Sequence, residues 1–388
     1  MKKIKIALIW KVLIACVLGG LLGRVLPAPI IRIFTTFNYI FSQYIGFMVP
    51  LIIVGLVIPA ISRMGTNAGK MLLFTIILAY FSSVVAGMFS YGVSTTMFPS
   101  FIGDIKFDVD NAADDGLAPF FTIDIPALMS VTSALVLSFL VGTLLAVTGK
   151  GALRDVAYDF EEIVTKAIST TLIPLLPIFI FGIFLKMSYS GEMLPVMTVF
   201  AKIILVIFAM SIVWLTVLFC ISSAVARKNP LRSMIAMLPA YLTALATSSS
   251  AATIPVTMSC TQKAGVCAPV SNFTVPLCAT IHMPGSMIKI TACAIAIMML
   301  QDIPFSFGLM IHFVMMVAIT AVAAPGVPGG VIMASLGVLS SVLGFDAGDQ
   351  ALMITLYIVM DSFGTACNVT ADGALAQIVD RVFQSEST

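Results

Sequence analysis

The sequence predicts an all-α polytopic membrane protein, and three observations favour this fold class. Of its 388 residues, 60% are hydrophobic and only 10% are charged, whereas soluble domains carry about 25% charged residues. The first part of the chain contains apolar runs of about 20 residues, the length that spans a hydrocarbon core. Beyond residue 230 the apolar segments are interrupted near their middles by Gly, Pro, Ser or Thr, so the chain combines simple spans with broken ones.

Six apolar runs come first, and we predict that each crosses the membrane. They cover residues 5–26, 38–62, 71–98, 125–148, 168–187 and 194–225. The first run has no clear cleavage site of small residues, so we interpret it as a retained helix, with a signal peptide as the alternative. The aspartate-rich stretch 99–118 predicts a long, acidic external loop.

The basic residues predict the orientation. They gather at the N-terminus and after the second, fourth and sixth runs: Lys2, Lys3, Lys5, Lys11, Arg63, Lys70, Lys150, Arg154, Lys166, Arg227, Lys228 and Arg232. Cytoplasmic loops carry an excess of Lys and Arg, so we expect a multi-pass protein of the cytoplasmic membrane with its N-terminus inside. No basic block points to nucleic acid. The seven cysteines form no CxxC pair, and we expect buried packing residues rather than disulfides or a metal site.

The interrupted segments predict backbone that is buried in protein or lines a wet cavity, because unpaired backbone groups are not tolerated in lipid. Segments 231–262 and 307–345 fit re-entrant helical hairpins, and 270–301 fits a span unwound around HMPGS. Broken apolar segments of this kind are typical of transporter binding sites.

A run of hydroxyl residues, Thr247–Ser250, lies at the tip of the first predicted hairpin. Free N–H groups at a helix start, together with hydroxyls, bind an anion well. This tip is therefore a candidate carboxylate site, with a plain helix cap or loop turn as the alternative.

The last predicted span, 349–378, carries a polar stripe. Its members are spaced by four, three and four residues, which places them on one helix face about 16 Å long: Asp361, Thr365, Asn368 and Asp372. Carboxylates inside a membrane cost roughly 2.5–3.5 kcal/mol each, so two on one face indicate a path for an ion and a polar solute. The alternative is a helix that already emerges into water.

The HMPGS break is the third polar element. Its Pro and Gly free backbone carbonyls, which suit a hard cation such as Na⁺. Lys289 lies two turns after His282 on the same side of the helix. We expect Lys289 to snorkel, to pair with an acid or to face the substrate.

These elements, in this order, resemble the dicarboxylate/amino acid:cation symporter family, the glutamate-transporter homologues. Four motifs carry the resemblance: SSSAATIPVTM, TVPLCATIHMPGS, APGVPGG and MDSFGTACNVTADG. It implies eight transmembrane helices plus two re-entrant hairpins, a homotrimer, and a mobile transport domain that moves like an elevator against a fixed scaffold. The implied scaffold is 1–70 and 99–187, and the implied transport domain is 71–98 and 188–388.

The resemblance also implies residue roles. Asp361 matches the aspartate that holds the substrate amino group, and Thr365 matches a substrate-contacting threonine. The remaining implied substrate contacts are Ser249, Ser250, Asn368 and, at the tip of the second hairpin, Gly326 and Val327. The implied cation ligands are Asp372, Ala279, His282, Asn368, Ser82 and Ser83.

Two departures from the family pattern affect the function. The family's N-M-D-G-T reads His-Met-Pro-Gly-Ser at 282–286, so a cation-site carboxylate is missing and His282 leaves proton coupling open. Gly364 stands where glutamate transporters have Arg for the distal carboxylate. We therefore expect Na⁺-driven uptake of a small neutral amino acid. The alternative, in which Lys289 supplies the missing charge, is cation- or proton-coupled uptake of acidic amino acids or C4-dicarboxylates.

Other functional classes fit less well. Asp361 and Asp372 share one helix about three turns apart, too far for an aspartyl protease pair, and there is no HExxH or GxSxG motif. A channel would need polar rings along a continuous pore. We expect no enzyme and no cofactor beyond the transported Na⁺ or H⁺, with a family member that has lost transport as a further alternative.

Overall fold

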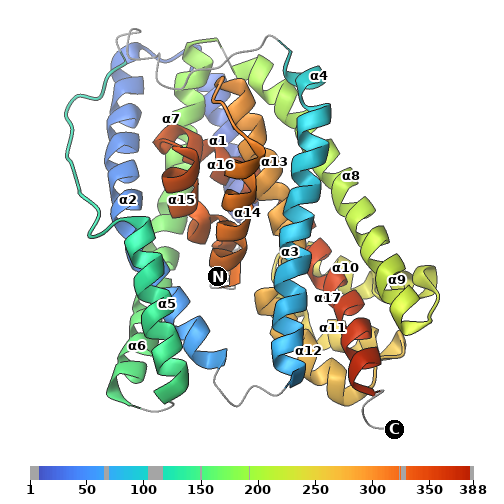
Figure 1. Ribbon diagram of the computed structural model, residues 1–388. Coiled ribbons are helices and arrows are strands. Elements are labelled where there is room, and N and C mark those ends of the chain that lie inside the picture. The colour runs from blue at the N-terminus through green and yellow to red at the C-terminus, as the bar shows by residue number, and fades with distance from the viewer. Residues whose placement is uncertain are drawn as a thin grey trace, which may run out of the picture.

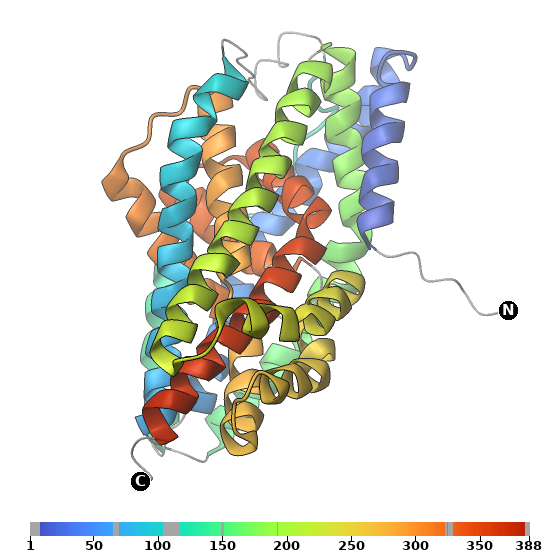
Figure 2. The same ribbon diagram turned by 90° about the vertical axis from the view of Figure 1, so that its right-hand side faces the viewer.

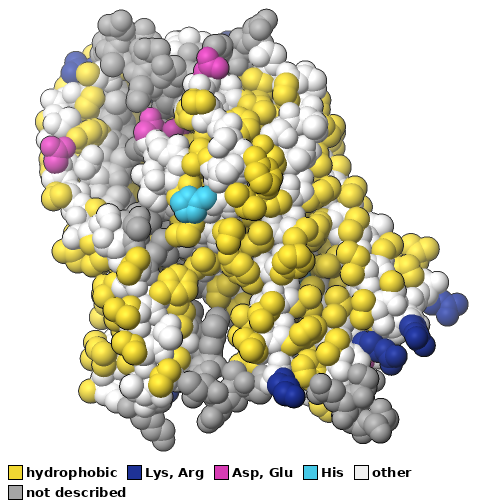
Figure 3. Space-filling view, viewed as in Figure 1, with side chains coloured by type: hydrophobic (Ala, Val, Ile, Leu, Met, Phe, Trp, Pro, Cys, Tyr) yellow, Lys and Arg dark blue, Asp and Glu magenta, His cyan; other side chains and the backbone are white. Residues whose placement is uncertain are grey.

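The computed structural model describes residues 8–64, 70–103, 117–148, 151–191, 193–322, 324 and 329–384, and the regular structure in these ranges is helical (Figure 1). The aspartates of the predicted external loop lie outside the described residues, as do Gly326 and Val327 at the second predicted tip. Apolar side chains cover much of the face shown in Figure 3, and exposed large hydrophobics occur on most of the long helices. This surface is the kind that a bilayer solvates.

One group of helices comes from the N-terminal part of the chain. It consists of α1 (Leu8–Leu22), α2 (Ala28–Met64), α5 (Val131–Thr148), α6 (Ala152–Ala167), the short π-helix η2 (Ile168–Leu172) and α7 (Ile173–Tyr189). α2 packs on α5, α6 and α7, while α1 packs on α7. Gly19 lets α1 approach closely, because a Cβ there would lie 2.7 Å from the backbone oxygen of Phe181. Small residues at such contacts are typical of membrane helix pairs.

The second group holds the rest of the chain. It consists of α3 (Lys70–Met97), α4 (Pro99–Ile102), α8 (Met193–Ala226), α9 (Pro230–Ala236), α10 (Leu238–Thr247), α11 (Ser250–Lys263), α12 (Ala268–Ile281), α13 (Pro284–Leu300), α14 (Phe307–Val322), α15 (Gly330–Leu343), α16 (Ala347–Val359) and α17 (Asp361–Gln384). α8 runs beside α17 (Figure 2), and α3 packs on α13 and α14. The helical stretch 268–300 is the most enclosed, with 94% of its most apolar window buried against 33% for α3.

Two helix pairs occupy the segments where re-entrant hairpins are predicted. α10 and α11 meet at Ser248 and Ser249, while α14 ends at Val322, α15 begins at Gly330 and the two helices pack together. The α10–α11 pair lies in the lower half of Figure 1 and the α14–α15 pair in the upper half, so the two pairs approach from opposite ends. Each predicted segment thus holds two packed helices, while their re-entrant character in a membrane stays a prediction.

Five helices are long and apolar enough to cross a membrane, or six when one bent pair is counted as a span, among the described residues. The expected count of eight therefore stays a prediction. The last span is not the single helix that we predicted, because α16 and α17 meet at a 63° bend around Met360. The bend makes Asp361 the first residue of α17 and places its side chain at a helix start.

Candidate substrate and cation site

A cavity of about 90 Å³ lies where the two tips, the break between α12 and α13, and the start of α17 meet. Its lining is mostly small or polar: Ser248, Ser249, Ser250, Ala251, Ala279, Thr280, Met283, Ser286, Ala324, Gly330, Val331, Tyr357, Asp361, Thr365 and Asn368. The structure thus brings together the predicted tip serines and the first three members of the polar stripe. Asp372, the fourth member, does not line this cavity.

The first tip is built by a change of backbone direction at Ser248. Its φ of 51° is left-handed, and its hydroxyl lies 2.7 Å from that of Ser362 at the start of α17. Ser249 then caps α11, because its Oγ accepts a hydrogen bond of 3.2 Å from the Ala252 N–H. The positive end of α11, a helix of 14 residues, therefore faces the cavity beside Asp361.

Asp361 joins the second helix pair to the broken span. Its Oδ2 accepts a hydrogen bond of 2.9 Å from the backbone N–H of Gly329, a residue with a left-handed φ of 77°. Its Oδ1 lies 3.3 Å from Nζ of Lys289. Both carboxylate oxygens therefore have partners although Asp361 is only 7% exposed, which is how a buried charge is stabilised.

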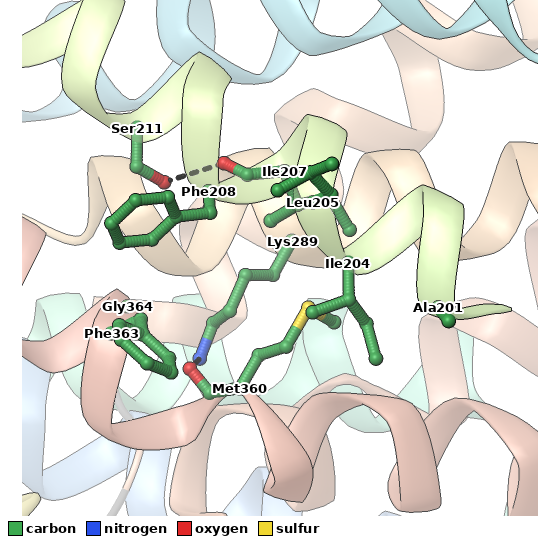
Figure 4. A pocket seen from close by; sticks show the side chains of 10 residues that line it. All are labelled: Ala201, Ile204, Leu205, Ile207, Phe208, Ser211, Lys289, Met360, Phe363 and Gly364. Carbon is green, nitrogen blue, oxygen red and sulfur yellow. Dashed lines mark hydrogen bonds between the residues drawn. The ribbon is translucent and has the colours of Figure 1, made fainter.

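Lys289 is buried behind Asp361 and does not line the cavity. Its Nζ also lies 3.5 Å from the Met360 carbonyl oxygen and 3.7 Å from the ring centroid of Tyr357. Of the three expected roles, pairing with an acid is the one seen. Figure 4 shows the side chain running from α13 past Gly364 toward Met360, along a second, largely apolar pocket of about 300 Å³ beside α8.

Gly364 and Lys289 share one space. A Cβ on Gly364 would overlap the end of the Lys289 side chain, Cε and Nζ included. The ammonium therefore occupies the place where any side chain at position 364 would begin. Lys289 brings a positive charge from α13 to a position on α17 that has no side chain of its own.

Asn368 and Thr365 have structural partners as well as a place in the cavity wall. The Asn368 Oδ1 accepts hydrogen bonds from the N–H groups of Gly285, at 2.7 Å, and Ser286, at 3.4 Å, and so caps the start of α13. Its Nδ2 lies 3.2 Å from the Ser286 hydroxyl. The Thr365 hydroxyl donates to the Asp361 carbonyl oxygen at 2.9 Å.

A second buried cluster lies outside the cavity, where α3, the α12–α13 break and α17 meet. The His282 Nδ1 is 2.9 Å from Asp372 Oδ1, and its Nε2 is 3.0 Å from the Ser82 hydroxyl. The neighbouring Ser83 hydroxyl accepts a hydrogen bond of 3.2 Å from the Met283 N–H. Three of the expected cation ligands are therefore bonded to one another. The remaining two, Ala279 and Asn368, lie in the cavity wall.

Comparison with known proteins gives the family. Residues 8–382 match the sodium:dicarboxylate symporter family, which is nearly the whole chain. The chain belongs to this family. It is 36% identical over 163 residues to excitatory amino acid transporter 3 of Oryctolagus cuniculus, covering 42% of this chain and 31% of that protein.

Two further relatives show the same extent of similarity. Excitatory amino acid transporter 1 of Homo sapiens is 34% identical over 163 residues, 42% of this chain and 30% of that protein. An excitatory amino acid transporter of Caenorhabditis elegans is 31% identical over 170 residues, 44% of this chain and 33% of that protein. The aligned part thus spans at most 33% of each relative's length. By name the family and these relatives are transporters, not enzymes.

Sequence reasoning missed several residues at this cavity. Tyr357 donates to or accepts from the Ser286 hydroxyl at 3.0 Å and stacks against the Lys289 ammonium. Its position four residues before Asp361 was an available signal, since such residues share a helix face. The Gly329 N–H and the Ser362 hydroxyl carried no such signal, because tertiary contacts between distant segments bring them to the site.

Proposed function

We propose that this protein is a secondary active symporter that couples Na⁺ entry to the uptake of an acidic amino acid. The observation that carries the proposal is the cavity between the two tips, which combines a carboxylate, Asp361, with the N-terminal end of α11. The neutral substrate expected from Gly364 is less well supported than its alternative, because the relatives are named excitatory amino acid transporters and the family is named for dicarboxylates.

The charges in and behind the cavity favour an amino acid with a second acid group. A substrate ammonium matches Asp361, and its α-carboxylate matches the start of α11 together with the Asn368 amide. An ammonium that takes over Asp361 Oδ1 releases Lys289 from its 3.3 Å contact, and in this proposal the lysine then moves from behind Asp361 to meet the distal carboxylate. A C4-dicarboxylate lacks the ammonium and would set two carboxylates against Asp361, so the acidic amino acid is the better match.

The wider arrangement supports transport by movement of one helix group against the other. In this proposal α1, α2 and α5–α7 form the scaffold, and α3 and α8–α17 carry the site, with the assembly a homotrimer. On the face in Figure 3, Lys and Arg side chains lie mostly at the lower end and Asp and Glu in the upper half. By the positive-inside rule the lower end is cytoplasmic, which agrees with an N-terminus inside a cytoplasmic membrane.

Uptake into proteoliposomes tests the proposal. The purified protein is reconstituted, and radiolabelled acidic amino acids, neutral amino acids and C4-dicarboxylates are supplied under an inward Na⁺ gradient and, separately, an inward proton gradient. We expect Na⁺-driven accumulation of an acidic amino acid. Accumulation of neutral amino acids alone would return the substrate to the class expected from Gly364, and uptake driven only by protons would contradict Na⁺ coupling.

Protein-free liposomes and the variant Asp361→Asn are the controls. The first measures leak, and the second keeps the size of the side chain while removing the charge that holds the substrate ammonium. Equal flux with and without a gradient, without saturation, would indicate a channel rather than a symporter.

A further inference from the structure

The cluster of His282, Asp372 and Ser82 has no part in the substrate cavity, yet it lies at the centre of the second helix group. All three side chains are buried, at 0%, 1% and 6% exposed. They come from three segments that are far apart in the sequence: α3, the α12–α13 break and α17. Ionisable groups at such depth are costly and mark functional positions in membrane proteins.

We propose that the imidazole of His282 takes the place of a coupling cation. It fills the site that Asp372 and Ser82 would otherwise offer to Na⁺, so the Na⁺ that drives transport binds elsewhere. This inference rests on the proposed Na⁺ symport and specifies which buried groups do not hold the transported ion.

Both ring nitrogens of His282 have hydrogen-bond partners without an ion. A neutral imidazole with its proton on Nδ1 donates to Asp372 Oδ1 at 2.9 Å, and its Nε2 accepts from the Ser82 hydroxyl at 3.0 Å. The donated N–H stabilises the buried carboxylate in the way that a cation would. The nearby Ser83 hydroxyl is also engaged, because it accepts from the Met283 N–H.

Space and ligand chemistry exclude an ion between the ring and the acid. A cation of the size of Na⁺ has oxygen ligands at about 2.4 Å. Two neighbouring ligands at right angles around it therefore lie about 3.4 Å from each other. The nitrogen and the oxygen are closer than that, at hydrogen-bond distance. Hard cations prefer oxygen ligands, and imidazole is a ligand for transition metals. The break also lacks a second acid, because position 284 is Pro.

The concentration of Na⁺ that stabilises the protein tests this inference. The full chain is purified in detergent, and its Tm is followed against NaCl, with choline chloride keeping the ionic strength constant. Ligand binding to the folded state raises Tm in a concentration-dependent way. Loss of fold stability alone lowers Tm without moving the half-maximal Na⁺ concentration, whereas loss of an ion ligand raises that concentration. The half-maximal concentration therefore decides whether the cluster holds Na⁺.

Asp372→Asn is the first variant, since its amide oxygen can still accept from the imidazole. We expect the half-maximal Na⁺ concentration to stay within about twofold of the wild type, whereas loss of a charged ligand would raise it about tenfold or more. A tenfold rise overturns the inference. Ser82→Ala, which removes a single hydroxyl, is the milder form of the same test.

His282→Asn is the complementary variant, because it removes the ring and leaves Asp372 room for an ion. We expect stronger Na⁺ stabilisation than in the wild type, and an unchanged response would overturn the inference. A wild type with no Na⁺ stabilisation and no Na⁺-driven uptake would contradict the proposed symport instead. Even in that case the assignment of His282 is tested separately, because it requires that Na⁺ stabilise the His282→Asn variant.

Discussion

Two aspartates on α17 have basic partners from the same broken span, yet their surroundings differ. Asp361 pairs with Lys289 and lines the cavity, where it also holds the N–H of Gly329 at the second tip. Asp372, about 16 Å further along α17, contacts His282 and lies outside the cavity. In the proposed function the first acid exchanges its partner for a substrate, while the second is enclosed.

The difference shows that a polar stripe on a membrane helix does not define one site. Residues spaced for a common helix face reach different neighbours, because the α12–α13 break lies against the middle of the stripe. Asn368 stands at the boundary, with Oδ1 on the start of α13 and Nδ2 near Ser286 in the cavity wall. Five predictions sharpen or break the comparison, beginning with the largest expected effect.

Asp361→Asn removes the accessible charge. We expect uptake to fall more than about 100-fold, because breaking a buried pair costs about 3–5 kcal/mol. Initial rates in proteoliposomes measure the loss, and size-exclusion chromatography checks folding. Asp155→Asn on the exposed part of α6 is the matched control and should transport normally. Normal uptake by Asp361→Asn would show that the charge of the accessible aspartate is not needed for transport.

Lys289→Met removes the partner of Asp361 and keeps most of the side-chain volume. We expect uptake of acidic substrates to fall about 30-fold or more, since a charged hydrogen bond contributes about 1.5–3 kcal/mol and the unpaired acid adds to the cost. Competition assays with acidic and neutral amino acids separate a change of selectivity from a general loss.

The double variant Lys289→Met with Gly364→Arg restores a cation in the vacated space. Because Lys289 fills the place where a side chain at position 364 begins, the arginine fits only when the lysine is absent. We expect partial recovery in the double variant and misfolding or inactivity in Gly364→Arg alone. Equal activity of the single and double variants would show that position 364 and Lys289 do not share a role.

Tyr357→Phe removes one hydroxyl and keeps the ring that covers Lys289. The Ser286 hydroxyl loses its 3.0 Å partner, and a hydrogen bond of this kind contributes about 1 kcal/mol, equivalent to about fivefold in KM. Kinetics of Na⁺-driven uptake measure the change. An unaltered KM would indicate that Tyr357 acts through its ring alone.

Ser82→Ala tests the enclosed cluster of His282, Asp372 and Ser82, and it should have the smallest effect on uptake. The Nε2 atom of His282 loses its partner, so we expect a loss of about 1 kcal/mol in the free energy of unfolding and an unchanged KM. Thermal unfolding in detergent and uptake kinetics measure the two quantities. A large rise in KM would show that the His282 cluster communicates with the cavity.

The sequence supports the helical class, the helix pairs at the two predicted hairpin segments and the meeting of Ser249, Asp361 and Asn368, because local patterns and motif order encode these features. It did not predict the bend at Met360, the burial of Lys289 behind Asp361 or the bonding of His282 to Asp372. These depend on contacts between segments that lie 70 or more residues apart. The neutral substrate expected from Gly364 is less well supported than its alternative, and in the proposed function Lys289 from another helix supplies the charge that α17 lacks.

The amide of Asn368 has a consequence for how filling of the cavity is communicated. One side chain holds the first turn of α13 through its oxygen while its nitrogen borders the cavity. In the proposed function a substrate carboxylate that bonds to this nitrogen also pulls on the side chain that anchors the first turn of α13. Binding in the cavity would then change the position of the helix that carries Lys289.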